Sequence, residues 1–363
     1  MATSGGKSSA TLMLLVLLGG GLGFALAEVG IRLVAPQPTG PTMFAYDPIL
    51  GSVPTPDQTA VRTFPGGYAY RYTNDAMGLR TVVRRIQARA DFVVLLLGDS
   101  FTYGVGVDDD QTFASVLQAN LDGAGLRVRV VNAGNPGKGT DYAVRFLEVY
   151  GRVFRPDLTV LGFFANDFSD NLTGDYYELI SNGPLRLRDL SSSFYARKDY
   201  LRKSAIYNWI MSRSHAGNLV RLWVVGSMLP DLYRGGGSAN NHIGRGVNPS
   251  YATPESVRVT EILVKELARL VAEAGGNLVS MYIPSSTEVE TFRLSRIPSP
   301  DESAFMQIAN RLGVPLFSLT QILADQPQVI SMLYYREGHW TPLSHAIAAS
   351  SLAGPVRSAL GAR

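Results

Sequence analysis

Cysteine is absent from this chain of 363 residues, and there are only four histidines. Without cysteine the protein has no disulfides, no Cys-ligated zinc and no thiol nucleophile. The chain also lacks any dense run of Lys and Arg, although its pI is near 9, so a nucleic-acid partner is not indicated. What is present is a composition that is 46% hydrophobic and 17% charged, which suits a globular protein with a sizeable core.

A long segment near the N-terminus contains no charge at all. It runs from Ser8 to Ala27, with Lys7 before it and Glu28 after it. About 20 such residues match a hydrocarbon core roughly 30 Å thick, so residues 1–34 are predicted to form a membrane anchor. Lys7 favours a cytoplasmic N-terminus and an extracytoplasmic, periplasmic location for the rest of the chain.

Two other interpretations of the N-terminal segment stay open. The triplet Ala25-Leu26-Ala27 has the small-x-small form of a signal-peptidase site, so the segment could instead be a cleaved signal of a secreted protein. A buried helix of a soluble protein is the other alternative, but such a helix normally has a polar face.

From residue 91 onward, apolar runs of strand length alternate with helical patterns. Strands are predicted at 92–97, 128–132, 158–164, 277–283 and 314–317. Helices are predicted at 111–122, 141–151, 255–275, 301–312 and 343–360. This alternation predicts an α/β fold of flavodoxin-like type, with three layers (α/β/α) around a central parallel sheet. Ligands of such sheets bind beyond the carboxyl ends of the strands.

Two regions depart from the alternation. Residues 35–90 begin with a stretch to residue 70 that is rich in Pro, Gly, Thr and Tyr, and we expect a membrane-proximal linker and lead-in outside the core. The main domain then covers 91–363, with a mainly helical insertion at about 168–253 that ends in a Gly/Asn-rich loop at 234–246. The insertion either roofs the site or is a purely structural subdomain.

Polar residues follow the predicted strands at one edge of the sheet. Ser100 follows the first strand in a Gly-Asp-Ser triplet, and a serine hydroxyl there needs a base and an oxyanion cradle to act as a nucleophile. A glycine-rich turn follows the second strand, Asn166 follows the third, and His339 precedes the last helix. Taken singly, these residues could be a helix cap, a turn glycine and a structural histidine; their order along the chain is more specific.

This set resembles the SGNH (GDSL-like) hydrolase superfamily. The resemblance is to its membrane-anchored, extracytoplasmic members associated with bacterial polysaccharide acylation, in which an Asn-x-x-Gly-x-Arg-like stretch precedes the nucleophile strand. Here Asn74 to Arg80 comes close, with one extra residue. The resemblance implies that Ser100 is the nucleophile and His339 its base. The Ser100 N–H, the Gly137 N–H and the Asn166 side chain would form the oxyanion hole, with Gly134 as the rival of Gly137.

The acid of the triad departs from the family pattern. The usual Asp is replaced by Glu337, two residues before His339. A carboxylate orients the imidazole and stabilises its cation, so Glu337 is assigned this role, and Asp167 is a weaker candidate. A Ser–His dyad without an acid, or a protein that has lost catalysis, stays open.

The predicted function is that of a serine esterase or acyl transferase that acts through an acyl-enzyme. The resemblance implies O-acyl groups, in the first place O-acetyl groups, of an extracytoplasmic carbohydrate as substrate. No metal or other cofactor is implied. The alternatives are a lipid esterase or lysophospholipase, and a non-catalytic carbohydrate-binding subunit with the same fold.

Overall fold

The computed structural model describes residues 5–37, 39–64, 68–84, 90–173, 176–179, 185–190, 199, 203–228 and 250–361. The predicted Gly/Asn-rich loop at 234–246 lies outside these residues.

Five parallel strands form the central sheet in the order β11-β10-β7-β5-β6. They are β5 (Phe92–Leu97), β6 (Val128–Asn132), β7 (Leu158–Phe164), β10 (Asn277–Ile283) and β11 (Leu316–Ser318). Counted along the chain, this is the 2-1-3-4-5 order of flavodoxin-like folds. The predicted fold class is confirmed, and four of the five strands have the predicted bounds.

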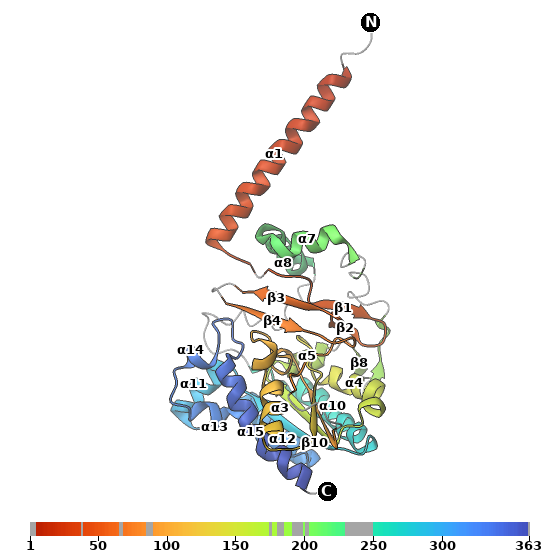
Figure 1. Ribbon diagram of the computed structural model, residues 1–363, viewed down its shortest axis with the longest axis vertical. Helices are drawn as coiled ribbons and strands as arrows, with labels where there is room; N and C mark the ends of the chain where they lie inside the picture. The colour runs from red at the N-terminus through yellow and green to blue at the C-terminus, as the bar shows by residue number, and fades with distance from the viewer. Residues whose placement is uncertain are drawn as a thin grey trace.

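Helices cover both faces of this sheet (Figure 1). On one face lie α4 (Thr140–Phe154), α5 (Asp167–Thr173), α10 (Pro254–Glu273) and α12 (Pro300–Leu312). On the other lie α3 (Phe113–Gly123), α11 (Ser286–Ser295), α13 (Leu319–Ala324), α14 (Ile330–Leu333) and α15 (Pro342–Gly361).

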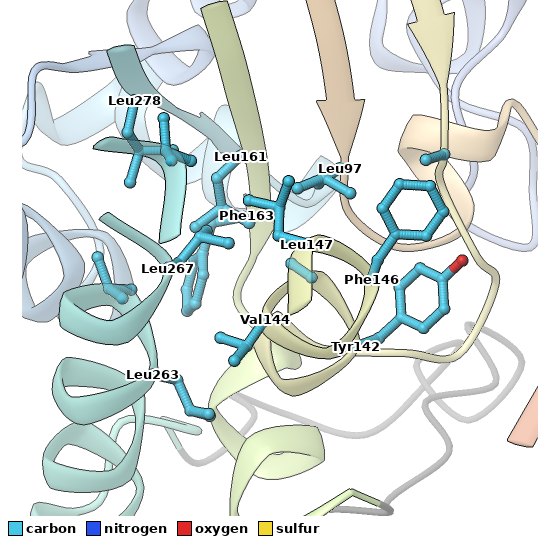
Figure 2. Packing of buried hydrophobic residues seen from close by; sticks show 14 of the residues in the cluster. Leu97, Tyr142, Val144, Phe146, Leu147, Leu161, Phe163, Leu263, Leu267 and Leu278 are labelled. Carbon is cyan, nitrogen blue, oxygen red and sulfur yellow. The ribbon is translucent and has the colours of Figure 1, made fainter. Parts of the chain in front are cut away.

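Each strand contributes to two separate cores because successive side chains point to opposite faces. Leu97 of β5 packs with the α4 and α10 residues, whereas Leu96 packs with α3 and α15. Figure 2 shows the first core, where Phe163 of β7 lies between Leu147 of α4 and Leu267 of α10. Burial on both faces explains why the strands are continuous apolar runs without alternation.

Residues 35–70 differ from the expected extended segment outside the core. They contain the hairpins β1 (Phe44–Asp47) with β2 (Gly51–Pro54), and β3 (Thr59–Thr63) with β4 (Ala69–Thr73). Met43, Tyr70 and Tyr72 are buried with Tyr103, which lies just after the first strand of the main sheet. The expectation rested on the Pro- and Gly-rich composition of the segment, whereas the tyrosine rings at alternate positions of β4 supply the buried face of a strand.

Part of the described insertion packs against the N-terminal helix. Its helices α7 (Ala205–Arg213) and α8 (His215–Met228) lie beside the end of α1 (Gly5–Val34), as Figure 1 shows. The hairpin β8 (Tyr177–Leu179) with β9 (Leu185–Leu187) is separate from the main sheet. The start of the insertion belongs to the main domain, because Phe168 and Tyr176 are fully buried in the α4–α10 core.

Candidate active site

The turn after β5 presents Ser100 at the carboxyl edge of the sheet. Gly98 is needed in this turn, because a Cβ there would lie 2.3 Å from Thr102 Oγ1 and 2.6 Å from Gly162 O. Asp99 caps the short helix α2 (Ser100–Tyr103) by accepting a 2.9 Å hydrogen bond from the Phe101 N–H. The residue that caps α2 is therefore Asp99 and not Ser100. The Ser100 hydroxyl makes only a long hydrogen bond to Asp99 Oδ2, at 3.5 Å.

His339 reaches Ser100 from a tight turn between α14 and α15. Its Nε2 lies 3.0 Å from Ser100 Oγ, which is hydrogen-bonding distance. The turn is closed by the Tyr335 N–H donating to His339 O at 2.8 Å and by the Gly338 N–H donating to Tyr335 O at 2.9 Å. The next residue, Trp340, is fully buried and fixes this turn against the core.

Glu337 lies on the other side of the imidazole. Its Oε1 is 3.4 Å from His339 Nδ1, and both side chains are largely buried. This separation is longer than an ordinary charge-assisted hydrogen bond. The same Oε1 accepts a short hydrogen bond from the Tyr68 hydroxyl, and the Tyr68 ring stacks on Tyr335 with centroids 4.0 Å apart.

Tyr68 comes from the β3–β4 hairpin and was not predicted as a site residue. Burial, followed by the hydrogen bond to Glu337, raises its pKa far above the usual value, so the phenol remains protonated and donates. The signal in the sequence was the alternation Tyr68, Tyr70, Tyr72, which marks a strand with one aromatic face. Its pairing with a residue 269 positions away has no local signature.

The two glycines of the turn after β6 have different surroundings. The Gly134 N–H donates to Asn132 Oδ1 at 3.0 Å, and a Cβ at Gly134 would lie 2.3 Å from Tyr103 N. Gly137 has a φ of 75°, and a Cβ there would meet nothing within 4 Å. Gly134 therefore serves close packing of the backbone, and Gly137 has open space beside it.

Asn166 lies in the turn between β7 and α5 and is buried. Its Nδ2 donates to Asp170 Oδ2 at 3.0 Å, which fixes the plane of the amide. An amide nitrogen carries two hydrogens, so one N–H is left for another acceptor. Because β6 and β7 flank β5 in the sheet, Gly137 and Asn166 lie at the same edge as Ser100, on either side of its strand.

The Asn74–Arg80 stretch supports the turn that carries Ser100. The Tyr103 hydroxyl donates to Asn74 Oδ1 at 2.7 Å. The fully buried Arg80 pairs with Asp109 at 2.8 Å and donates to Val107 O at 2.8 Å. Asn74 thus binds the last residue of α2, and Arg80 binds the chain that follows this helix.

Two buried carboxyl groups lie close to Ser100: Asp99, in the same turn, and Asp167, at the start of α5. Burial raises the pKa of Asp99 to about 6, although the Phe101 N–H and His339 act in the opposite direction. Burial raises the pKa of Asp167 well above its usual value, and the carboxylates of Asp99 and Asp170 raise it further. The candidate role of Asp167 as triad acid has no support from a contact with His339 among the described residues.

The raised pKa of Asp167 predicts a pH-dependent effect of Asp167→Asn on stability. The folded protein holds this proton more tightly than the unfolded chain, so its contribution to stability is lost as pH rises from about 4 through the raised pKa. Asn does not titrate. The Tm of the variant relative to wild type should therefore increase between pH 4 and pH 7, by about 3 °C or more.

Thermal unfolding followed by circular dichroism measures this difference. Asp110→Asn, at an exposed position of the 3-10 turn η1 (Asp109–Gln111), is the matched control and should shift Tm equally at both pH values. A Tm difference for Asp167→Asn that stays constant or shrinks with rising pH contradicts the assignment.

Within the described ranges, no three His, Asp or Glu side chains are grouped so that they could hold a metal ion.

Residues 94–199 match the family model described as GDSL-like Lipase/Acylhydrolase. The matched segment contains Ser100, Gly137 and Asn166. This match confirms the predicted resemblance to GDSL-like hydrolases, and with it the prediction of a serine hydrolase that acts on ester bonds. The narrower resemblance to anchored members associated with polysaccharide acylation stays a prediction. No curated protein matches the chain.

The chain is also similar, at a low level, to solved structures of hydrolases. The psychrotrophic esterase EstA from Pseudoalteromonas sp. is 12% identical, with a TM-score of 0.42 over 75% of this chain and 100% of that one. The α/β hydrolase LAE5 from the metagenome of Lake Arreo is 14% identical, with a TM-score of 0.42 over 74% and 95%. A catalytic mutant of the acetylxylan esterase Axe2 from Geobacillus stearothermophilus is 13% identical, with a TM-score of 0.41 over 74% and 94%.

Proposed function

We propose that Ser100 attacks an ester carbonyl while His339 accepts its proton; the ester C–O bond then breaks, and the alcohol leaves with the proton that His339 returns. Water or a sugar hydroxyl, deprotonated in turn by His339, then attacks the acyl-enzyme, releases the acyl group and restores the Ser100 hydroxyl. The observation that carries this proposal is the 3.0 Å distance between Ser100 Oγ and His339 Nε2. Proton removal by a base at this distance is what makes a serine hydroxyl nucleophilic. Glu337 acts as the acid that stabilises the imidazolium, and Tyr68 holds its carboxylate.

The oxyanion hole in this proposal consists of the Ser100 N–H, the Gly137 N–H and the Asn166 side chain. The engagement of the Gly134 N–H by Asn132 supports Gly137 over Gly134. Donors that are already fixed when charge develops on the carbonyl oxygen lower the barrier without reorganisation. The hydrogen bond to Asp170 supplies such fixation for Asn166.

A short acyl group suits the space beside His339. The Phe101 ring lies 5.4 Å from the imidazole and packs on Phe164 at 4.7 Å and on Trp340 at 5.2 Å. Phe101 and Trp340 are buried, so these rings fill the space that a long acyl chain would need on this side. This packing favours a short acyl group such as acetyl, whereas the extracytoplasmic carbohydrate rests on the resemblance to anchored members of the superfamily alone.

The membrane anchor is part of the same proposal. Ala10–Val34 is long and apolar enough to cross a membrane by length and composition, and the structure buries none of its apolar window. A signal sequence passes the same test. We assign residues 1–34 to the anchor, 35–90 to a lead-in whose hairpins complete the site, and 91–363 to a periplasmic hydrolase domain with its insertion at about 168–253.

The substrate is tested with the full chain in detergent or vesicles. Acetate should be released from O-acetylated polysaccharide, and kcat/KM should be at least about 10-fold higher for an acetyl ester than for a hexadecanoyl ester, a difference of ~1.4 kcal/mol. Preference for the long chain, or for lysophosphatidylcholine, would favour the lipid esterase. If no ester is cleaved and a fluorophosphonate does not label Ser100, the chain is a non-catalytic binding protein.

A further inference from the structure

Helices α7 and α8 are joined to the end of α1 by polar contacts. The Glu28 carboxylate accepts hydrogen bonds from the Ser214 hydroxyl at 2.8 Å, from the His215 N–H at 2.9 Å and from the Ala216 N–H at 2.8 Å. Arg32 pairs with Glu28 at 2.7 Å and donates to Arg213 O at 3.0 Å. A residue of α1 thus caps the N-terminus of α8.

These contacts fix the height of α8 relative to the apolar part of α1. Glu28 is the first charged residue after the run from Ser8 to Ala27. If that run spans the hydrocarbon core, Glu28 lies where the hydrocarbon meets the headgroups. The first residues of α8 touch Glu28, so they lie at the same level. Figure 1 shows α7 and α8 at the lower end of α1, above the β1–β4 hairpins.

Both helices expose large apolar side chains at this level. On α7, Trp209 is 62% exposed and Ile206 lies one turn before it, also exposed. On α8, Trp223 is 71% exposed and Val220 lies one turn before it, also exposed. A pair of exposed residues one turn apart forms a strip along a helix. Tryptophan is enriched where the chain meets the membrane–water interface.

We propose that α7 and α8 form a foot that lies on the lipid surface beside the anchor, with Trp209 and Trp223 inserted among the headgroups. The proposal rests on the anchor proposed above. The two strips bind the bilayer and not another protein, because the contacts with Glu28 and Arg32 hold both helices at the membrane surface. An interfacial helix holds its apolar side chains about 5–10 Å into the headgroup and acyl boundary, so the foot fixes the orientation of the hydrolase domain.

The three tryptophans of the chain allow a direct test. The full chain is reconstituted in vesicles of phosphatidylcholine and phosphatidylglycerol, with and without brominated acyl chains that quench nearby indole fluorescence. Trp340 is fully buried in the domain, so quenching reports Trp209 and Trp223. We expect bromine to remove roughly half of the emission. Trp209→Phe and Trp223→Phe should each reduce the quenching, and the double variant should abolish it.

A matched control places a tryptophan on an exposed part of the domain away from α1. Leu294→Trp on α11, in the background of the double variant, introduces an indole at a position that is 90% exposed. It should be quenched by aqueous iodide and not by brominated lipid.

Two failures are distinguishable. If the chain floats with the vesicles but Trp209 and Trp223 are quenched by iodide and not by bromine, the strips face water or a partner protein, and only the foot is overturned. If the chain does not float with vesicles at all, the anchor and the foot both fail.

Discussion

Ser100→Ala should lower kcat on a short-chain acetyl ester by about 10³-fold or more, with the fold unchanged. Removing the nucleophile of a triad leaves only the oxyanion hole and substrate binding to act. The fold should persist because Asp99, and not Ser100, caps α2, and because His339 is held by its turn and by the buried Trp340. Initial rates and a circular dichroism melt of both proteins measure the two parts of this prediction.

Ser350→Ala is the control for this experiment. Ser350 lies on the exposed side of α15, where its hydroxyl donates to Ala346 O. It should retain wild-type activity and fluorophosphonate labelling, whereas Ser100→Ala should lose both. Activity of Ser100→Ala within tenfold of wild type would show that another group is the nucleophile.

Glu337→Gln should lower kcat on the order of 10²-fold, with a smaller change in KM. The amide keeps the shape of the side chain but removes the charge that stabilises the imidazolium as it forms. The carboxylate lies 3.4 Å from His339 Nδ1, close enough for charge to act and too far for a strong hydrogen bond, so the loss should be smaller than that of the nucleophile. Glu337→Asp should be milder.

Tyr68→Phe tests whether the position of the Glu337 carboxylate matters for catalysis in addition to its charge. The variant keeps the carboxylate and the stacking on Tyr335 but removes the hydroxyl that donates to Oε1. We expect a loss of about fivefold, near 1 kcal/mol, the usual worth of one hydrogen bond. Glu290→Gln, on the exposed side of α11, serves as the charge control.

If the Gln, Ala and Asp variants at position 337 all keep kcat within about threefold of wild type, under ~1 kcal/mol, His339 works without this acid.

The central fold was predictable because its strands are buried on both faces. Such strands are continuous apolar runs, and 92–97, 128–132, 158–164 and 277–283 have the observed bounds. The exception is β11, predicted at 314–317 and found at Leu316–Ser318. This strand lies at the edge of the sheet and is only half-buried, so its sequence is less clearly a continuous apolar run.

The site was predictable up to the residues that follow the strands. A parallel sheet brings the carboxyl ends of its strands to one edge, so Ser100, Gly137 and Asn166 needed only the right strand order. The contact of Tyr68 with Glu337 was out of reach, because tertiary packing of aromatic rings decides it and it has no spacing rule. Arg80 belongs to a stretch that its spacing singled out, but its hydrogen bond to Val107 O could not be predicted. The fully buried guanidinium of Arg80 is unusual for its residue type and is visible only in the structure.

The contacts that complete the site also fix when it can first exist during synthesis. Ser100 and His339 are separated by 239 positions, and Tyr68 and Glu337 by 269. A chain is made from its N-terminus and its early domains fold as they emerge. Ser100 and the β3–β4 hairpin therefore emerge long before Glu337 and His339, which lie in the final part of the chain. In the proposed mechanism, a nascent or truncated chain that ends before residue 337 should carry an inert serine, and hydrolytic activity should appear only once the last turn and α15 have been made.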